Sequence, residues 1–506
     1  MDFRGYIPEN FRILTEIQFI PALLSLNIII LTSLILLTLI FGRVYCSSIC
    51  PMGVYQDIVA WLSKKRKKKK KYSYSNAKNV LRWSILVTTI IAFIFGFNFL
   101  VGLLDPYGAY GRIVTHIFRP IYLEGNNLLA SIFTSFNNYT FYKVGIYLLS
   151  VSSTIIALVT ILVIGYMAWS SGRLYCNTIC PVGTILGFIS KYSLLKVQFV
   201  DNKCNKCGLC SMKCKSSCID SNNQQIDYSR CVTCFNCIEV CNRDAMKFSF
   251  KKSLKNVTKE AIANENVSKE SSVTNVKSIV KSKPINESKR RFLSATLATG
   301  LSAGNILAQN LSSGIMSKRE LKRQIPIAPP GAQSFKHLQE KCISCHLCVS
   351  KCPSHVIKPA FLEYGLGGIM QPKLYFDHGF CNYDCTVCGD VCPTGAILPL
   401  SVEDKNHTQM GKVHFILENC IVYYDETSCG ACSEHCPTQA VHMVPYKGHL
   451  TIPETDQSIC VGCGGCEYVC PAIPFKSIYV EGIKQHNTIE IEHDEVGKIL
   501  IDDFGF

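Results

Sequence analysis

Long apolar stretches and polar segments alternate in the first part of the chain. Predominantly apolar sequence covers residues 17–42, 80–104 and 144–169. A helix of about 20 apolar residues crosses a hydrocarbon layer of about 30 Å, so the pattern predicts three membrane spans. Every position from 64 to 71, between the first and second stretches, is Lys or Arg. Because basic loops stay on the cytoplasmic side, residues 170–290 should also face the cytoplasm.

The composition changes after residue 250. Residues 251–288 are rich in Lys, Ser, Asn, Val and Glu and contain no aromatic residue, so they should form a flexible linker. Residues 289–310 begin with Lys289, Arg290 and Arg291 and continue as a weakly apolar stretch. The sequence from 288 to 293 resembles the (S/T)RRxFL pattern of the twin-arginine signal, an address for export of folded proteins. We expect this segment to remain in place as a fourth span.

Two copies of one motif follow the first and third apolar stretches. Residues 42–53 read GRVYCSSICPMG, and residues 172–183 read GRLYCNTICPVG. Each copy carries two cysteines in a C-x3-C-P pattern, and a spacing of four places both thiols on one helix face. Three interpretations compete: a further metal cluster, a pair of redox-active thiols, or structural thiols beside a quinone pocket. We favour a redox or metal role without choosing the species. The cysteines are Cys46, Cys50, Cys176 and Cys180.

Cysteine is the strongest compositional signal, with 29 residues. A disulfide scaffold suits small secreted chains rather than one with membrane spans, so ligation of clusters is the better account. Two C-x2-C-x2-C-x3-C runs occur between 204 and 241, and in such pairs the fourth cysteine ligates the other cluster. Zinc sites use separated C-x2-C pairs, which disfavours zinc. Cys218 is left over as a buried structural thiol. The predicted ligand sets are Cys204, Cys207, Cys210 with Cys241, and Cys231, Cys234, Cys237 with Cys214.

Four further groups of four cysteines lie near the C-terminus, and each ends in Cys-Pro. Their sixteen thiolates fit four [4Fe–4S] clusters with none left over. The last cysteines could be exchanged between neighbouring groups, or between the outer and inner pairs of groups, and spacing does not decide between these arrangements. The groups are Cys342, Cys345, Cys348, Cys352; Cys381, Cys385, Cys388, Cys392; Cys420, Cys429, Cys432, Cys436; and Cys460, Cys463, Cys466, Cys470.

One short motif points elsewhere. Cys342, Cys345 and His346 match the CxxCH pattern of covalent haem attachment. Cys348 and Cys352 continue the cluster motif at the right spacing, however, and losing two cysteines to haem would break the set of sixteen. We therefore disfavour haem.

Charge and missing motifs exclude several functions. The net charge is +15, but the run at 64–71 supplies eight of these positive charges between apolar stretches, which does not favour nucleic-acid binding. The sequence has no dinucleotide-binding GxGxxG motif after a strand, no phosphate-binding GxxxxGK[ST] motif and no evident Ser/His/Asp set. These absences favour an electron carrier or a quinol-oxidising subunit over a substrate-transforming enzyme.

The predicted architecture combines an α-helical membrane domain, with three spans and a twin-arginine-like fourth, and α+β bacterial-type ferredoxin modules. The predicted domains are a transmembrane domain with two CxxxCP repeats at 1–200, a cytoplasmic two-cluster ferredoxin at 201–250, a linker at 251–288, a signal or anchor at 289–310, and a periplasmic four-cluster module at 311–506. This architecture implies about six [4Fe–4S] clusters, located on both faces of the cytoplasmic membrane.

Two protein families share these features. The paired GR-x-x-C-x3-CP motifs, the loop LDPYGAYG at 104–111 and the two-cluster run resemble NapH-type membrane ferredoxins. The twin-arginine start, the APPGA sequence at 328–332 and the four cysteine groups resemble NapG/MauM-type periplasmic ferredoxins. The chain thus resembles a fusion of the two.

The resemblance implies a membrane-bound protein that passes electrons between the quinone pool and a periplasmic reductase or cytochrome. Two alternatives stay open: a redox maintenance or maturation factor for a metalloenzyme, and reverse flow from a cytoplasmic ferredoxin to quinone. Clusters on opposite sides of about 30 Å of hydrocarbon are too far apart for fast direct tunnelling. We therefore expect a quinone, or a redox centre in a partner, to join the two ends.

Overall fold

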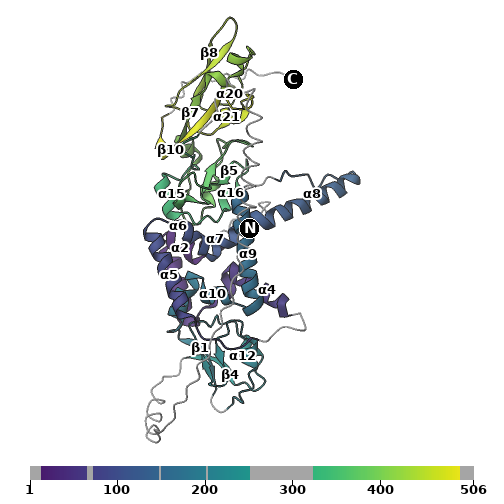
Figure 1. The fold of residues 1–506 in the computed structure, drawn as a ribbon, viewed down its shortest axis with the longest axis vertical. Coiled ribbons are helices and arrows are strands. Elements are labelled where there is room, and N and C mark those ends of the chain that lie inside the picture. The colour runs from purple at the N-terminus through teal and green to yellow at the C-terminus, as the bar shows by residue number, and fades with distance from the viewer. Residues whose placement is uncertain (1–12, 65–71, 147–149, 201–202, 251–322, 491–506) are drawn as a thin grey trace, which may run out of the picture. The chain divides into compact units, whose positions relative to one another are not determined.

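The computed structural model describes residues 13–64, 72–146, 150–200, 203–250 and 323–490 (Figure 1). The described residues before and after the gap at 251–322 belong to one compact unit. The predicted linker, the twin-arginine-like segment with Lys289, Arg290 and Arg291, and most of the basic run at 64–71 lie outside the described residues.

The described residues up to Ser190 form helices and helical turns. They are α1 (Ile13–Glu16), α2 (Phe19–Leu24), α3 (Ile28–Phe41), the π-helical turn η2 (Tyr45–Ile49), α4 (Pro51–Lys64), α5 (Asn79–Ile94), α6 (Asn98–Leu104), α7 (Pro106–Ile113), the π-helical turn η3 (Val114–Phe118), α8 (Arg119–Ser135), α9 (Val151–Ser171), α10 (Leu174–Thr178) and α11 (Pro181–Ser190).

The predicted domain with three spans is not supported. Among the described residues, α9 is the one helix that is both long and apolar enough to cross a membrane, with 21 residues and a mean hydropathy of 2.2. The first two predicted spans are each divided into two shorter helices, α2 with α3 and α5 with α6. The predicted fourth span falls outside the described residues, so the fold-class prediction is wrong for the membrane domain.

Local backbone chemistry explains both breaks. Leu26 has a left-handed φ of 55°, and the side chain of Asn27 accepts a hydrogen bond from the backbone N–H of Ile30 at 3.2 Å. Asn27 is therefore an N-cap, which starts a new helix after a residue that left the helical conformation. Between α5 and α6, Gly96 has a φ of 78°, as is common where a helix ends. A hydropathy average over 25 residues cannot detect either break.

The segment expected to be a loop at 104–111 is also helical. Asp105 caps α7, since its Oδ2 accepts from the backbone N–H of Gly108 at 2.6 Å, and Pro106 occupies the first helical position. The helical turn η3 and helix α8 follow directly, so helical structure continues from Pro106 to Ser135.

Residues 195–250 form a small α+β module, as predicted. β1 (Leu195–Phe199) pairs antiparallel with β4 (Met246–Phe250), and β2 (Ile219–Asp220) pairs with β3 (Gln225–Ile226). Two short helices, α12 (Leu209–Lys213) and α13 (Asn236–Glu239), lie between the strands in the sequence. Each helix carries the third cysteine of its run.

The C-terminal part is a second α+β module, built from short helices and two-stranded antiparallel sheets. Its sheets pair β5 (Ile357–Pro359) with β6 (Pro372–Leu374), β7 (Thr408–Phe415) with β10 (Ile478–Thr488), and β8 (Val441–Pro445) with β9 (Thr451–Thr455). Its helices are α15 (Phe335–Lys341), α16 (Leu347–Lys351), α17 (Val387–Asp390), α18 (Val402–Asn406), α19 (Ile421–Tyr424), α20 (Ala431–Glu434) and α21 (Gly465–Val469), with 3-10 turns η5 (Leu366–Gly368) and η6 (Leu417–Asn419). Its apolar side chains and many of its cysteines share one buried core.

Candidate iron–sulfur sites and a four-cysteine centre

Four of the predicted cysteine sets each line one small cavity. In every case three cysteines come from one run and the fourth comes from the neighbouring run. The sets are Cys204, Cys207, Cys210 with Cys241; Cys342, Cys345, Cys348 with Cys392; Cys420, Cys429, Cys432 with Cys470; and Cys460, Cys463, Cys466 with Cys436.

The cysteines of the remaining two sets also lie near one another. Burial, and then the nearby thiols of Cys231, Cys214 and Cys234, raise the pKa of Cys237. Burial, and then Cys381, Cys352 and Cys385, raise the pKa of Cys388. The structure thus places four cysteines around each of four cavities, and the thiols of the two remaining sets lie near one another. In the C-terminal module the fourth cysteine of each cavity comes from the neighbouring run.

These sets suit cubane clusters rather than disulfides. All 29 cysteines of the chain are free thiols in the structure. Among the described residues, no three His, Cys, Asp or Glu side chains are grouped as for a single metal ion. The four thiolates of a [4Fe–4S] cluster bind four different irons, so they surround a space instead of meeting at one point.

Short helices place the third cysteine of each run. Several of these helices start at a residue in the left-handed region, including Gly208 before α12, Phe235 before α13, His346 before α16 and Gly464 before α21. The turn brings the first two thiols of the run toward the start of the helix that carries the third.

His346 is held by two hydrogen bonds. Its Nε2 donates to the carbonyl of Met370 at 2.9 Å, so its Nδ1 accepts from Nε2 of His116 at 2.8 Å. Both ring nitrogens of His346 are therefore engaged in hydrogen bonds.

The four cysteines of the CxxxCP repeats converge in one buried place. Each side chain is about 4 % exposed, and all four belong to the same hydrophobic core. The prediction that the two thiols of each motif share one helix face is wrong. Cys46 and Cys176 lie on the short helical segments η2 and α10, whereas Cys50 and Cys180 are extended residues directly before α4 and α11.

Two fully buried arginines join the repeats reciprocally. Arg43 of the first repeat donates to the carbonyl of Cys176 at 3.2 Å and to its own repeat's Cys46 Sγ at 3.8 Å. Arg173 of the second repeat donates to the carbonyl of Cys46. It also forms a bidentate pair with Asp57, in which Nε lies 2.9 Å from Oδ1 and Nη2 lies 2.7 Å from Oδ2. Both arginine side chains are 0 % exposed.

Gly53 and Gly183 make these contacts between the two repeats possible. A Cβ at Gly53 would clash with the carbonyl of Cys46, and a Cβ at Gly183 would clash with the carbonyl of Cys176. The last glycine of each repeat therefore lets the cysteine-bearing turn fold back onto the helix that follows.

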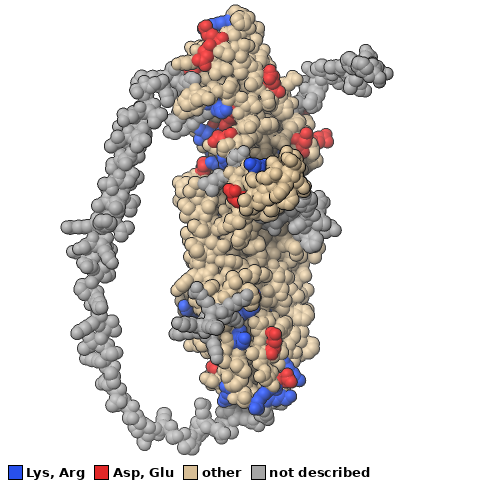
Figure 2. All heavy atoms as spheres, turned by 90° about the vertical axis from the view of Figure 1, so that its right-hand side faces the viewer, with Lys and Arg blue, Asp and Glu red and all other residues tan. Residues whose placement is uncertain are grey.

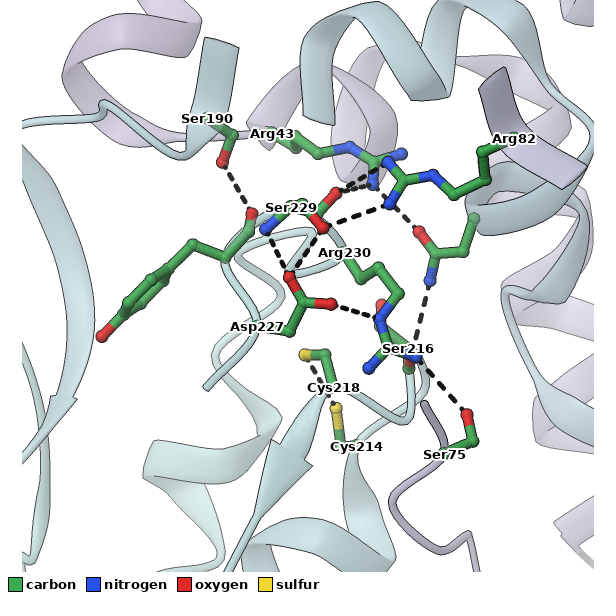
Figure 3. Close-up of polar contacts among 12 residues, drawn as sticks. Arg43, Ser75, Arg82, Ser190, Cys214, Ser216, Cys218, Asp227, Ser229 and Arg230 are labelled. Carbon is green, nitrogen blue, oxygen red and sulfur yellow. Dashed lines mark hydrogen bonds and ion pairs between the residues drawn. The ribbon is translucent and has the colours of Figure 1, made fainter. Parts of the chain in front are cut away.

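Arg43 also connects the repeats to the first ferredoxin module (Figure 3). It donates to the carbonyl of Ser229 at 3.1 Å, and Arg82 donates to the Ser229 Oγ at 3.1 Å. Asp227 accepts from Ser229 Oγ at 2.6 Å and from Nε of Arg230 at 2.7 Å. This network fixes the turn that immediately precedes Cys231, a predicted cluster ligand.

The other side of the four-cysteine site contacts the C-terminal module. Gly102 and Gly108 lie against the carbonyl of Ile343, where an added Cβ would come within 2.6 and 2.9 Å of the oxygen, and Gly111 lies against the carbonyl of Cys345. The fully buried Arg112 donates to the carbonyl of Ser344 at 3.2 Å. The helices around residues 98–113 thus pack directly on the turn that carries two predicted ligands.

Cys218 lies beside a predicted cluster set. Its side chain is 1 % exposed, and its Sγ is 3.5 Å from Sγ of Cys214 (Figure 3). Since a ligating thiolate accepts hydrogen bonds, Cys218 is placed to donate its S–H to Cys214.

Comparison with known proteins shows that 4Fe-4S binding domains are present in this chain. A family model described as "4Fe-4S binding domain" matches residues 24–70 and 153–199, which include both CxxxCP repeats. A model described as "4Fe-4S dicluster domain" matches residues 341–396 and 427–472. The chain is 29% identical over 177 residues to the methylamine utilization ferredoxin-type protein MauM of Methylobacillus flagellatus, covering 33% of this chain and 72% of the relative.

Two Escherichia coli proteins are also similar. Identity to the ferredoxin-type protein NapG is 28% over 191 residues, covering 36% of this chain and 80% of NapG. Identity to the ferredoxin-type protein NapH is 21% over 226 residues, covering 42% of this chain and 66% of NapH. The resemblance to NapH-type and NapG/MauM-type ferredoxins is confirmed. The chain is therefore related to ferredoxin-type 4Fe-4S electron-transfer proteins, and 4Fe-4S binding domains are present.

Sequence reasoning missed the three fully buried arginines, Arg43, Arg112 and Arg173. Each of these three follows a glycine, in the Gly-Arg pairs at 42–43, 111–112 and 172–173. A basic residue inside apolar sequence that is rich in cysteine would have been a usable signal, because a buried cation requires a nearby anion or hydrogen-bond acceptors.

Proposed function

We propose that the chain is a membrane-associated electron-transfer protein that carries six [4Fe–4S] clusters on the 24 cysteines grouped above. The observation that carries this proposal is the assembly of six sets of four thiols, each completed by a cysteine from the neighbouring run. Bound clusters would accept and release single electrons, while the protein sets their potentials through burial and hydrogen bonds to sulfur.

The predicted partners are the quinone pool and a periplasmic reductase or cytochrome. Relatives named as ferredoxin-type proteins NapG and NapH support an electron-transfer chain of this kind. The electrons would move from quinol toward the reductase, and the cluster potentials would set this direction.

Membrane association is supported by the apolar surface. Helix α9 can cross a bilayer by length and composition, and α3 and α5 expose large apolar side chains such as Ile29 at 83% and Val80 at 87%. On the face drawn in Figure 2, a broad area is almost free of Lys, Arg, Asp and Glu. An apolar surface of this extent is typical of contact with lipid or with another protein.

Export of the C-terminal module remains a prediction from residues 289–310. Iron–sulfur clusters are assembled in the cytoplasm, so a module that works outside would cross the membrane in its folded form. The twin-arginine-like residues Lys289, Arg290 and Arg291 would provide the address. Replacing Arg290 and Arg291 by Lys should keep the module inside, as protease protection in intact cells would report.

The alternative of a thiol-based maintenance factor is less well supported. Its working residues would be the CxxxCP cysteines, but each of these side chains is only about 4 % exposed and is enclosed in the core. A thiol that exchanges disulfides with another protein must be accessible to it.

The test uses anaerobically purified full-length protein in detergent. A menaquinol analogue is added, and cluster EPR signals are followed. Appearance of reduced-cluster signals supports quinol oxidation. The opposite result is that some clusters are intact and reducible by dithionite within the potential range of the quinol, and yet stay oxidised when quinol is added. That result would contradict quinol oxidation and would favour a cytoplasmic ferredoxin as the donor.

A further inference from the structure

The four CxxxCP cysteines form a site of their own, separate from the six sets described above. We propose that Cys46, Cys50, Cys176 and Cys180 together hold one further [4Fe–4S] centre, and that this centre relays electrons within the chain between the first ferredoxin module and the C-terminal module. The inference rests on the proposed function, because it requires clusters at both ends of the relay.

The donor set fits one cluster shared by the two repeats. A [4Fe–4S] cluster needs four thiolates around one space, and each repeat supplies only two. The structure brings both pairs into the same buried core. A cluster in each repeat separately would leave two ligand positions to be filled by other side chains.

Charge gives the second argument. Arg43 is fully buried, and among the described residues it forms no ion pair with a carboxylate; its partners are Cys46 Sγ, the amide of Asn177 and backbone carbonyls. Its Nε has no hydrogen-bond partner. Burying an unbalanced guanidinium is costly. Four thiolates around a [4Fe–4S]²⁺ core carry a net charge of about −2, which would balance Arg43 and supplement the Asp57 pair of Arg173.

Helix ends provide a third argument. The 14-residue α4 and the 10-residue α11 begin directly after Cys50 and Cys180, each with Pro at its first position. The N-terminal end of a helix carries a partial positive charge and free N–H groups, so both helices favour an anion at this place. Sγ of Cys180 already accepts from the N–H of Gly183 at 3.3 Å.

The position of the site between two predicted clusters suggests the relay. The hydrophobic core that contains the four cysteines also includes Val232 of the first ferredoxin module and Ile343 of the C-terminal module, and Cys234 and Cys345 pack against it. Cys234 belongs to a set in the first ferredoxin module, and Cys345 belongs to the first set of the C-terminal module. Tunnelling rates fall steeply with distance, so a centre between these sets would divide one long step into two short ones.

The redox step is simple. One electron leaves a reduced cluster on the Cys231 set, takes the central core from 2+ to 1+, and then moves to an oxidised cluster on the Cys342 set, or it follows the reverse path. No bond forms or breaks, and each electron gained by one cluster is lost by its neighbour. No quinone and no partner centre is then required to join the two modules.

The test counts metal in the full-length chain and in Cys46→Ser/Cys176→Ser. Iron and acid-labile sulfide are measured with zinc in the same samples, and Mössbauer spectra identify the cluster type. Seven clusters give about 28 irons per chain and six give about 24. We expect about 28 in the unaltered chain and a loss of about four from the double variant. Cys218→Ser, a buried cysteine outside every set, should keep all of them.

EPR of the reduced proteins tests the relay. In the unaltered chain the signals of the flanking clusters should show coupling to the central spin in addition to the coupling within each module, and this additional coupling should disappear in the double variant. About 24 irons in the unaltered chain, zinc in place of the missing iron, or flanking signals that are identical in the unaltered chain and the double variant would overturn the inference while leaving the six-cluster proposal intact. An iron content far below 24 would instead contradict the proposed function. Because the count on the unaltered chain is decisive, a variant that fails to fold does not prevent the test.

Discussion

Arg43 and Cys176 lie 133 positions apart in the sequence, yet the guanidinium of Arg43 donates to the Cys176 carbonyl at 3.2 Å. The reciprocal contact joins Arg173 to the carbonyl of Cys46. Each repeat therefore needs the arginine of the other to complete its cysteine turn, which explains why the Gly-Arg pair recurs with the CxxxCP motif.

Replacing Arg43 tests this exchange. Arg43→Met removes the bonds to Cys176, Asn177 and Ser229 and leaves buried acceptors unpaired, so we expect the folded state to lose about 3 kcal/mol. The measurement is the apparent unfolding temperature in detergent. Lys247→Met, at an exposed position, is the control and should change stability by less than about 0.5 kcal/mol. Equal melting of both variants would contradict the role given to Arg43.

A pair of helical glycines tests the contact with the C-terminal module. Gly111→Ala places a Cβ against the carbonyl of Cys345, so it should cost about 1–3 kcal/mol and disturb the EPR signal of the cluster on the Cys342 set. Gly125→Ala in α8 meets nothing within 4 Å and should leave that signal unchanged while stabilising the helix by up to about 1 kcal/mol. An unaltered signal in Gly111→Ala would show that the two surfaces are apart in solution.

Double variants test the exchange of the fourth cysteine in the first ferredoxin module. Cys241 lines a cavity with Cys204, so Cys204→Ala/Cys241→Ala should lose only the iron of one cluster. Cys231→Ala/Cys241→Ala should damage two clusters, and its losses should add. The measurement is iron per chain with EPR spin integration. The reverse pattern would mean that each run binds its own cluster.

Cys218 is expected to tune a cluster without binding it. Cys218→Ala removes the thiol 3.5 Å from Sγ of Cys214, so the reduction potential of that cluster should become more negative by an amount on the order of tens of mV. Cys218→Ser keeps a donor and should retain a potential closer to that of the unaltered chain. Redox titration followed by EPR measures both. Loss of four irons from the Ala variant would show instead that Cys218 is a ligand.

Local spacing was enough to propose the cysteine sets of the first ferredoxin module, and the structure places Cys241 at the cavity that Cys204 lines. That these cysteines bind clusters stays a prediction. Spacing alone could not show that Cys392 and Cys470 complete the sets of neighbouring runs, because the nested arrangement of outer and inner groups fits the same spacing. The structure decides this through tertiary packing, which brings Cys392 to the cavity lined by Cys342.

Hydropathy was less reliable for the helical part. It averaged across the cap at Asn27 and the left-handed Gly96, and so it merged four helices into two predicted spans. The convergence of Cys46 with Cys176 also depends on contacts between segments about 130 positions apart in the chain, which the repeat suggests but cannot place. Composition alone gave no reason to expect buried arginines there.

The most direct test of the account is the iron and acid-labile sulfide content of anaerobically purified full-length protein, with Mössbauer spectra of the same sample. The account predicts at least about 24 irons and as many sulfides per chain, all in [4Fe–4S] clusters. Stoichiometric zinc, or a content of about eight irons or fewer despite anaerobic handling, would contradict an electron-transfer function based on six clusters.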